Sequence, residues 1–121
     1  MTLAEHKAAQ PGAPVYMYYL TWETPVGNGV FKSPHTLDIP FMFNNVDKAV
    51  ALTGDSPEAR KLEEQMSSSW IAFARRGDPN NDTVPEWPAY DHERRAAMVF
   101  DVKPTVVDDP KREVRLLLQG E

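Results

Sequence analysis

The chain carries a run of apolar and aromatic residues with no polar alternation, from Val15 to Trp22 (VYMYYLTW). A strand with one face in solvent alternates apolar and polar positions, so this pattern predicts a strand that is covered on both faces. Gln10-Pro11-Gly12 precedes the run and marks the end of a polar helical segment over residues 1–10. The pattern therefore favours an α/β protein with a parallel sheet.

The clearest helix begins after residue 56. Asp55-Ser56-Pro57-Glu58 supplies a capping oxygen, a proline at the first helical position and an acid in the first turn. Gly77 supplies a left-handed stop after two arginines. Apolar residues repeat every three or four positions, which predicts one apolar face made of Leu62, Met66, Trp70 and Phe73.

The part of the chain after residue 95 predicts two short strands and a last helix. The strands cover Ala97–Val102 and Thr105–Val107, and the proline between them favours a sheet edge. Asp108-Asp109-Pro110 is expected to cap a helix that ends in three leucines, residues 116–118. These elements supply no parallel neighbours for the first strand, so residues 1–121 are expected to be a piece of a larger sheet.

Composition excludes several classes of function. The chain has 121 residues, of which 41% are hydrophobic and 26% charged, as in ordinary globular domains. A net charge of −5 argues against a nucleic-acid or anionic-membrane partner. With no cysteine, disulfides and thiolate metal sites are impossible. The scattered glycines form no phosphate loop and the three histidines no close ligand pair, so neither a cofactor nor a metal is expected.

The expected location follows from what the chain does not carry. Its apolar runs are shorter than the ~20 residues of a membrane span. Residues 1–10 lack the basic-then-apolar layout of a signal peptide. A cytoplasmic location is favoured, although an export signal could lie on a preceding segment.

His35 is the candidate with the most useful chemistry. It stands on a short polar loop, between the strand-like run and the apolar turn Leu37–Phe43. Imidazole titrates near pH ~6.5 and can accept and return a proton at neutral pH, which a general base requires. Taken alone, this position fits a loop histidine that caps the following turn better than a catalytic base. His6 and His92 lie in polar surface runs and are expected to be solvated.

The nucleophile that such a base needs is missing from the chain. The strained strand-to-helix turn of hydrolases requires Gly-x-Ser-x-Gly, and no serine here has that setting. Ser33 precedes a proline, Ser56 is a helix cap, and residues 67–69 are serines in mid-helix. A small self-contained hydrolase that uses one of these serines is therefore disfavoured.

Five segments, taken together and in order, resemble type-B carboxylesterases, the group that includes para-nitrobenzyl esterases. Residues 12–18 resemble the strand that precedes the catalytic histidine, and His35–Phe43 is similar to the family's His-x-x-Glu-Leu-Pro-Tyr/Phe-Val-Phe segment. Residues 70–80 (WIAFARRGDPN) resemble Trp-x-x-Phe-Ala-x-x-Gly-Asp-Pro-Asn. The sequences WPAYD and MVFD match the next two landmarks, at residues 87–91 and 98–101.

The resemblance implies the C-terminal part of an α/β-hydrolase over residues 1–121, with the nucleophile-bearing part absent. It implies that His35 is the general base and acid of ester cleavage through an acyl-enzyme. Asp38 stands where the family usually has glutamate, and it is given only a structural role near the loop. The serine, the orienting acid and the oxyanion-hole glycines would lie upstream.

The resemblance also implies a small-molecule carboxylic ester as substrate. Trp22, Phe31 and Phe41 are the candidate substrate-binding residues. Core packing is the alternative for each of them, and for Phe43 it is the favoured one. Phe31 fits either role.

Two functions stay open at this stage. The first is a serine esterase segment that is inactive without its N-terminal part. The second is a non-catalytic binding or oligomerisation module, in which the strand edge of Val15–Trp22 pairs with another chain or an identical copy.

Overall fold

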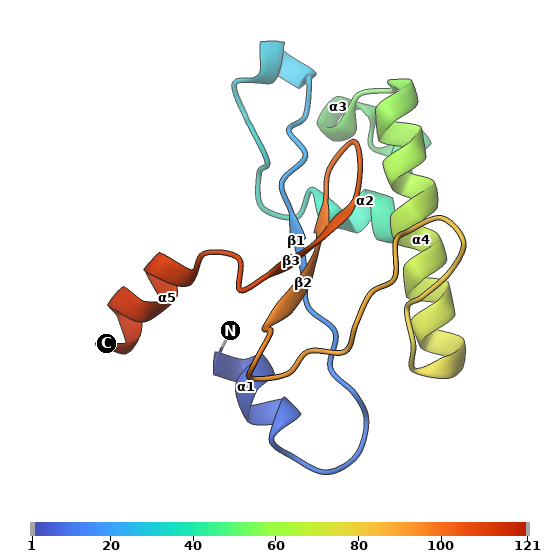
Figure 1. Cartoon of the computed structure of the whole chain (residues 1–121). Helices are drawn as coiled ribbons and strands as arrows, with labels where there is room; N and C mark the ends of the chain where they lie inside the picture. The colour runs from blue at the N-terminus through green and yellow to red at the C-terminus, as the bar shows by residue number, and fades with distance from the viewer. Residues whose placement is uncertain (1, 121) are drawn as a thin grey trace.

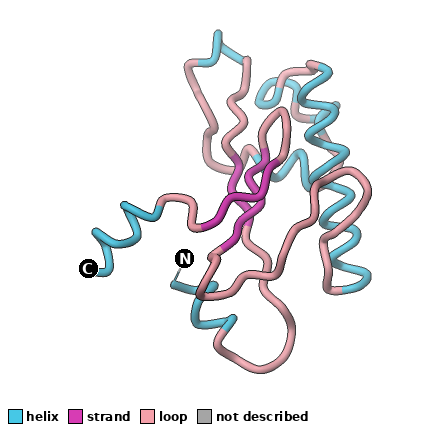
Figure 2. Tube along the Cα trace, in the orientation of Figure 1, coloured by secondary structure: helices cyan, strands magenta, loops and turns pink. Residues whose placement is uncertain are grey.

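A computed structural model describes residues 2–120 (Figures 1 and 2). The α-helices are α1 (Thr2–Ala8), α2 (Asp38–Met42), α3 (Val50–Thr53), α4 (Pro57–Arg76) and α5 (Arg112–Gln119). Two 3₁₀ helices are η1 (Val26–Gly29) and η2 (Val46–Lys48), and the strands are β1 (Tyr18–Leu20), β2 (Ala96–Phe100) and β3 (Thr105–Asp108). No helix within residues 2–120 has the length and apolar character that a membrane span requires.

The three strands form one mixed sheet in the order β1-β2-β3. β1 runs parallel to β2, with Tyr18 opposite Met98, although the two strands are far apart in the sequence. β2 and β3 pair as an antiparallel hairpin. The expectation that the later elements supply no parallel neighbour for the first strand is therefore wrong, because β2 is one. The two later strands and the edge position of β3 are confirmed.

The first strand is shorter than predicted. Only Tyr18–Leu20 forms the ladder, and backbone hydrogen bonds from Met98 to Met17 and from Thr21 to Phe100 extend the pairing by one residue at each end. Tyr19 points away from the core and is 42% exposed. The expectation of cover on both faces is wrong for the described part of the chain, because α4 covers one face of the sheet and no described helix covers β1 equally on the other (Figure 1).

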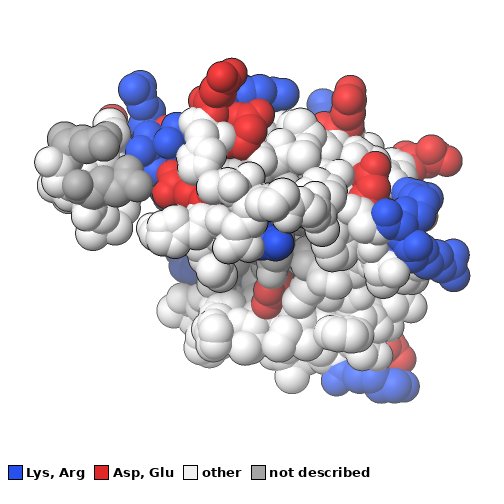
Figure 3. Space-filling view, turned by 90° about the horizontal axis from the view of Figure 1, so that it is seen from below, with Lys and Arg blue, Asp and Glu red and all other residues white. Residues whose placement is uncertain are grey.

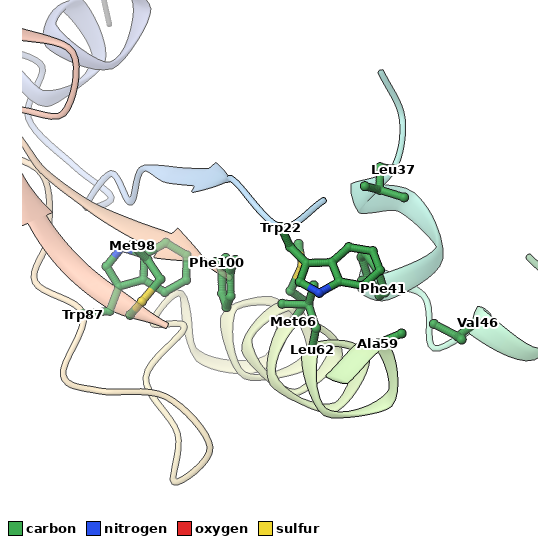
Figure 4. Close-up of a cluster of buried hydrophobic side chains, with 10 residues drawn as sticks. All are labelled: Trp22, Leu37, Phe41, Val46, Ala59, Leu62, Met66, Trp87, Met98 and Phe100. Atoms are coloured by element: carbon green, nitrogen blue, oxygen red, sulfur yellow. The ribbon is translucent and has the colours of Figure 1, made fainter. Parts of the chain in front are cut away.

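The hydrophobic core lies between the sheet, α2 and α4 (Figure 4). Trp22, at the end of the β1 segment, packs edge-to-face on Phe41 of α2 with ring centroids 5.3 Å apart. Phe100 of β2 packs in the same way on Trp87, at 5.7 Å. The buried cluster consists of Trp22, Leu37, Phe41, Val46, Ala59, Leu62, Met66, Trp87, Met98 and Phe100.

Helix α4 has the ends that were predicted for it. The Ser56 Oγ accepts a hydrogen bond from the Ala59 backbone N–H at 3.1 Å, and Gly77 ends the helix with φ 72° and ψ 13°. Leu62 and Met66 are fully buried, as the apolar pattern predicted. Phe73 differs, because it lies in the last turn of α4, where it meets Tyr16 edge-to-face with ring centroids 6.0 Å apart and stays 46% exposed.

Removal of the Ser56 cap should destabilise α4 measurably. Ser56→Ala leaves the Ala59 N–H without its side-chain acceptor, which is expected to lower the free energy of unfolding by about 1 kcal/mol. Ser68→Ala is the matched control, because alanine is the better helix former in mid-helix and should be neutral or slightly stabilising. Urea unfolding followed by circular dichroism measures both variants, and equal midpoints for the two would contradict the capping role.

The last helix does not begin as predicted. The residue before α5 is Lys111, in the left-handed region at φ 66°, and it makes no side-chain capping hydrogen bond. Asp109 instead accepts hydrogen bonds from the Arg115 guanidinium at 2.8 and 3.1 Å, which lowers the pKa of this carboxyl. The acid therefore holds α5 through an arginine inside the helix, and α5 projects away from the sheet (Figure 1).

Candidate active site

A long loop leaves the carboxyl end of β1, turns through η1 and returns to the same end of the strand before α2 begins (Figure 1). Two contacts close its base. The Thr24 N–H donates to the Lys32 carbonyl at 2.9 Å, and Lys32 Nζ lies 2.9 Å from the Glu23 carboxylate. Gly27 and Asn28 reverse the chain in the left-handed region, at φ 62° and 57°. The loop thus returns residues 33–37 to the end of β1.

His35 lies exposed in the turn just before α2. The turn is closed by a hydrogen bond from the Leu37 N–H to the Pro34 carbonyl at 3.2 Å, and the Thr36 hydroxyl donates to the His35 carbonyl. His35 opens onto a shallow pocket of about 370 Å³. The pocket is lined by residues of β1 and of the returning loop: Tyr18, Tyr19, Leu20, Ser33, Pro34, His35, Thr36 and Asp38.

The position of this pocket is the one that α/β folds use for chemistry. Ligands of open α/β sheets bind beyond the carboxyl ends of the parallel strands. Leu20 is the last residue of β1, and it contributes to the same pocket as His35. His6 and His92 are exposed on α1 and on the turn before β2, away from this lining. Of the three histidines, only His35 lines this pocket.

The three candidate substrate-binding aromatics lie elsewhere. Trp22 and Phe41 belong to the buried core, at 4% and 0% exposed, where they pack on each other. Phe31 is 59% exposed and lies over η1, close to Gly27. None of the three lines the pocket around His35. Their substrate-binding role therefore stays a prediction. For Trp22 and Phe41, the structure shows core packing.

The expectation that Phe43 packs in the core is wrong, since its side chain is 67% exposed. The reason lies in the helical period. Leu37 and Phe41 are four residues apart, face the same side around the single turn of α2 and are buried. Phe43 follows two residues later, at the end of the helix, and therefore points to the opposite side.

The structure adds one polar pair that sequence reasoning did not identify. The Tyr18 hydroxyl on β1 donates to the Asp38 carboxylate at the start of α2, at 2.6 Å. Burial and the carboxylate together raise the pKa of Tyr18 well above its usual value. A tyrosine in an apolar strand was the only available signal, because a buried phenol normally finds a hydrogen-bond partner. The partner itself, 20 residues away, could not be inferred.

Charge on the surface is mixed in sign. In the face shown in Figure 3, acidic and basic side chains alternate around the rim and the central area is largely uncharged. Exposed ion pairs such as Arg94–Asp108, at 3.0 Å, follow the same pattern. This face offers no continuous basic surface for a polyanion.

The mixed sheet covered by a long helix matches solved esterases with TM-scores of 0.75 and 0.77 at 33% identity, which places the chain in the α/β-hydrolase class, and the fold is that of its C-terminal part. The Carboxylesterase family model matches residues 1–117. The chain belongs to the carboxylesterase family, as its motifs indicated.

Three similar proteins are each much longer than this chain. Para-nitrobenzyl esterase of Bacillus subtilis (strain 168) is 36% identical over 107 residues, which are 85% of this chain and 21% of that protein. A crystal structure of a Geobacillus stearothermophilus carboxylesterase has 43% identity and a TM-score of 0.77, covering 93% of this chain and 23% of its own. A Clostridium hathewayi esterase that can hydrolyse aliphatic aromatic polyesters has 34% identity and a TM-score of 0.77, with 88% and 21% covered. The chain thus spans about a fifth of the length of the relatives it matches.

Proposed function

We propose that this chain supplies the catalytic histidine of a serine carboxylesterase and acts together with a preceding segment that carries the nucleophile. The observation that carries the proposal is the exposed His35, held in a pocket at the carboxyl end of β1. Membership of the carboxylesterase family supports a carboxylic ester as the substrate. The relatives extend from a para-nitrobenzyl esterase to a polyester-hydrolysing esterase, so the proposed substrate is a small ester whose acyl and alcohol groups are left open.

His35 would take part in four proton transfers in one turnover. It would first accept the proton of the attacking serine hydroxyl, and the serine oxygen would bond to the ester carbonyl carbon. It would then give that proton to the leaving alcohol as the C–O bond breaks. Finally it would deprotonate the water that hydrolyses the acyl-enzyme and return the proton to serine. Backbone N–H donors for the oxyanion would come from the preceding segment, and each such donor is worth about 3–4 kcal/mol where it has been measured.

The missing nucleophile can be tested by reconstitution. We define the esterase fusion as the part of the B. subtilis para-nitrobenzyl esterase that precedes its matched region, joined to residues 1–121 of this chain. The 121-residue chain alone is expected to hydrolyse a para-nitrobenzyl ester no faster than free imidazole, because it lacks an activated serine. The fusion is expected to turn over, and an organophosphonate probe should label a serine of the preceding segment.

The control for that experiment is the preceding segment without residues 1–121, which should be inactive because it lacks the histidine. Turnover by the pure 121-residue chain, with probe attached to Ser33, which also lines the pocket, would contradict the proposal. A folded fusion that shows no turnover would contradict it equally.

A second candidate function rests on the open edge of β1. The sheet order places β1 at one edge, and among the described residues its outer side pairs with no other strand. Unpaired backbone N–H and C=O groups favour addition of a further strand. In a serine esterase that strand would come from the preceding segment, whereas in a non-catalytic module it would come from a second copy. Light scattering of the 121-residue chain tests the second, since a stable monomer would count against pairing with an identical copy.

A further inference from the structure

The ring of Tyr18 is fixed in the core from two sides. It meets Trp70 of α4 edge-to-face, with ring centroids 4.9 Å apart and an interplanar angle of 83°. On the sheet side it meets Phe100 of β2 at 6.3 Å and 65°. Aromatic pairs in this geometry are favourable beyond the area that they bury. The phenol is therefore held in one orientation, in which it extends from the core toward the pocket at the end of β1.

The hydroxyl group of Tyr18 binds Asp38, the residue at which α2 begins. The Tyr18 hydroxyl donates to Asp38 Oδ2 at 2.6 Å, a short distance typical of a charge-assisted O–H···O⁻ bond. Desolvation and the adjacent carboxylate raise the pKa of Tyr18, so the phenol keeps its proton at every pH at which an esterase works. The donor is thus permanent, and the bond joins β1 to α2 without passing through the loop.

The turn that this bond restrains carries His35 and is strained. Thr36, directly after His35, has φ 70°, a left-handed conformation that is a genuine outlier for a β-branched residue. Such a conformation persists only where the surroundings hold it in place. The first support is Leu37, which is 1% exposed in the core. The second is Asp38, held by Tyr18.

We propose that Tyr18 and Asp38 are positioning residues for the general base, and that their hydrogen bond holds the strained turn in the one conformation that aims His35 at its reaction partner. The inference rests on the proposed esterase function. Neither residue needs to touch the substrate or the proton that moves. Their effect is on the conformation of the turn, because only Thr36 and Leu37 separate His35 from the anchored carboxylate of Asp38.

The loss of the bond should affect the rate more than substrate binding. A small displacement of a catalytic group can reduce the rate by up to about 100-fold while the substrate still binds. In the esterase fusion, Tyr18→Phe and Asp38→Ala are each expected to lower kcat about 10- to 100-fold, with KM within about 2-fold of the parent. The double variant should be no worse than either single variant, because the two residues act as one unit.

Conservative replacement separates a positioning role from one that depends on charge. Asp38→Asn keeps an oxygen that can accept from the Tyr18 hydroxyl and should restore most of kcat. Tyr90→Phe is the matched control. Tyr90 is also buried, but its hydroxyl has no hydrogen-bond partner within residues 2–120, and it lies outside the lining of this pocket, so kcat should not change.

The outcomes separate this inference from the function on which it rests. If kcat is unchanged in Tyr18→Phe while the melting temperature falls, the pair only stabilises the fold and the inference is overturned. If Asp38→Asn is as slow as Asp38→Ala, the charge rather than the hydrogen bond matters, and the inference is again overturned. If the fusion stays active after loss of the imidazole in His35→Ala, the esterase proposal itself fails, whatever the Tyr18 variants do.

Discussion

His35→Ala in the esterase fusion is expected to lower kcat by about 10⁶-fold, the size of the loss when the histidine of a serine triad is removed. The reason is that every proton transfer of both half-reactions passes through this imidazole. No compensating base is at hand, because the pocket offers only hydroxyl groups and Asp38 among its described side chains, and Asp38 is already bonded to Tyr18.

The effect should be confined to catalysis. His35 is exposed, and surface substitutions of this kind usually change the free energy of unfolding by less than about 0.5 kcal/mol. His92→Ala removes an equally exposed imidazole from a turn outside the pocket and should leave kcat unchanged. Stopped-flow and steady-state assays with a para-nitrobenzyl ester, paired with thermal melts, measure both quantities. Retention of a tenth of the parent turnover by His35→Ala would remove His35 from the mechanism.

The parts of the fold that could be predicted from the sequence are those whose signals are local. Helix α4 is the clearest case, because Ser56 caps the N–H of Ala59, only three residues later, and Gly77 ends the helix through its own backbone freedom. The β2–β3 hairpin is similarly local, since its strands are consecutive. The lack of polar alternation indicated a parallel sheet, but the pairing of β1 with β2 joins residues far apart in the sequence and was not predicted.

Features that depend on contacts between distant residues could not be predicted. The start of α5 is an example, because an aspartate before a helix is usually a cap, but Asp109 here accepts from Arg115 instead. The candidate site shows the same division. His35 was found through a pattern of neighbouring residues, whereas the Tyr18–Asp38 bond depends on how a loop returns to the sheet.

Alanine variants of Phe41 and Phe31, the two phenylalanines that were candidates for the ester pocket, should differ clearly in their free energy of unfolding. Phe41→Ala is expected to lower the free energy of unfolding by about 3–5 kcal/mol, because it removes a fully buried ring and leaves a cavity beside Trp22. Phe31→Ala, at an exposed ring, should change it by less than about 0.5 kcal/mol. Urea unfolding of the 121-residue chain, followed by circular dichroism, measures both.

Since a loss of this size can unfold a small chain, Phe41→Leu serves as the milder variant and should unfold at a urea concentration between those of the parent and Phe41→Ala. Kinetics of the esterase fusion then test whether either phenylalanine contacts the substrate. A raised KM in Phe31→Ala with unchanged stability would place Phe31 at the substrate, because an exposed ring has little packing to lose. Normal stability in Phe41→Ala together with a raised KM would contradict the core role and return Phe41 to the ester pocket.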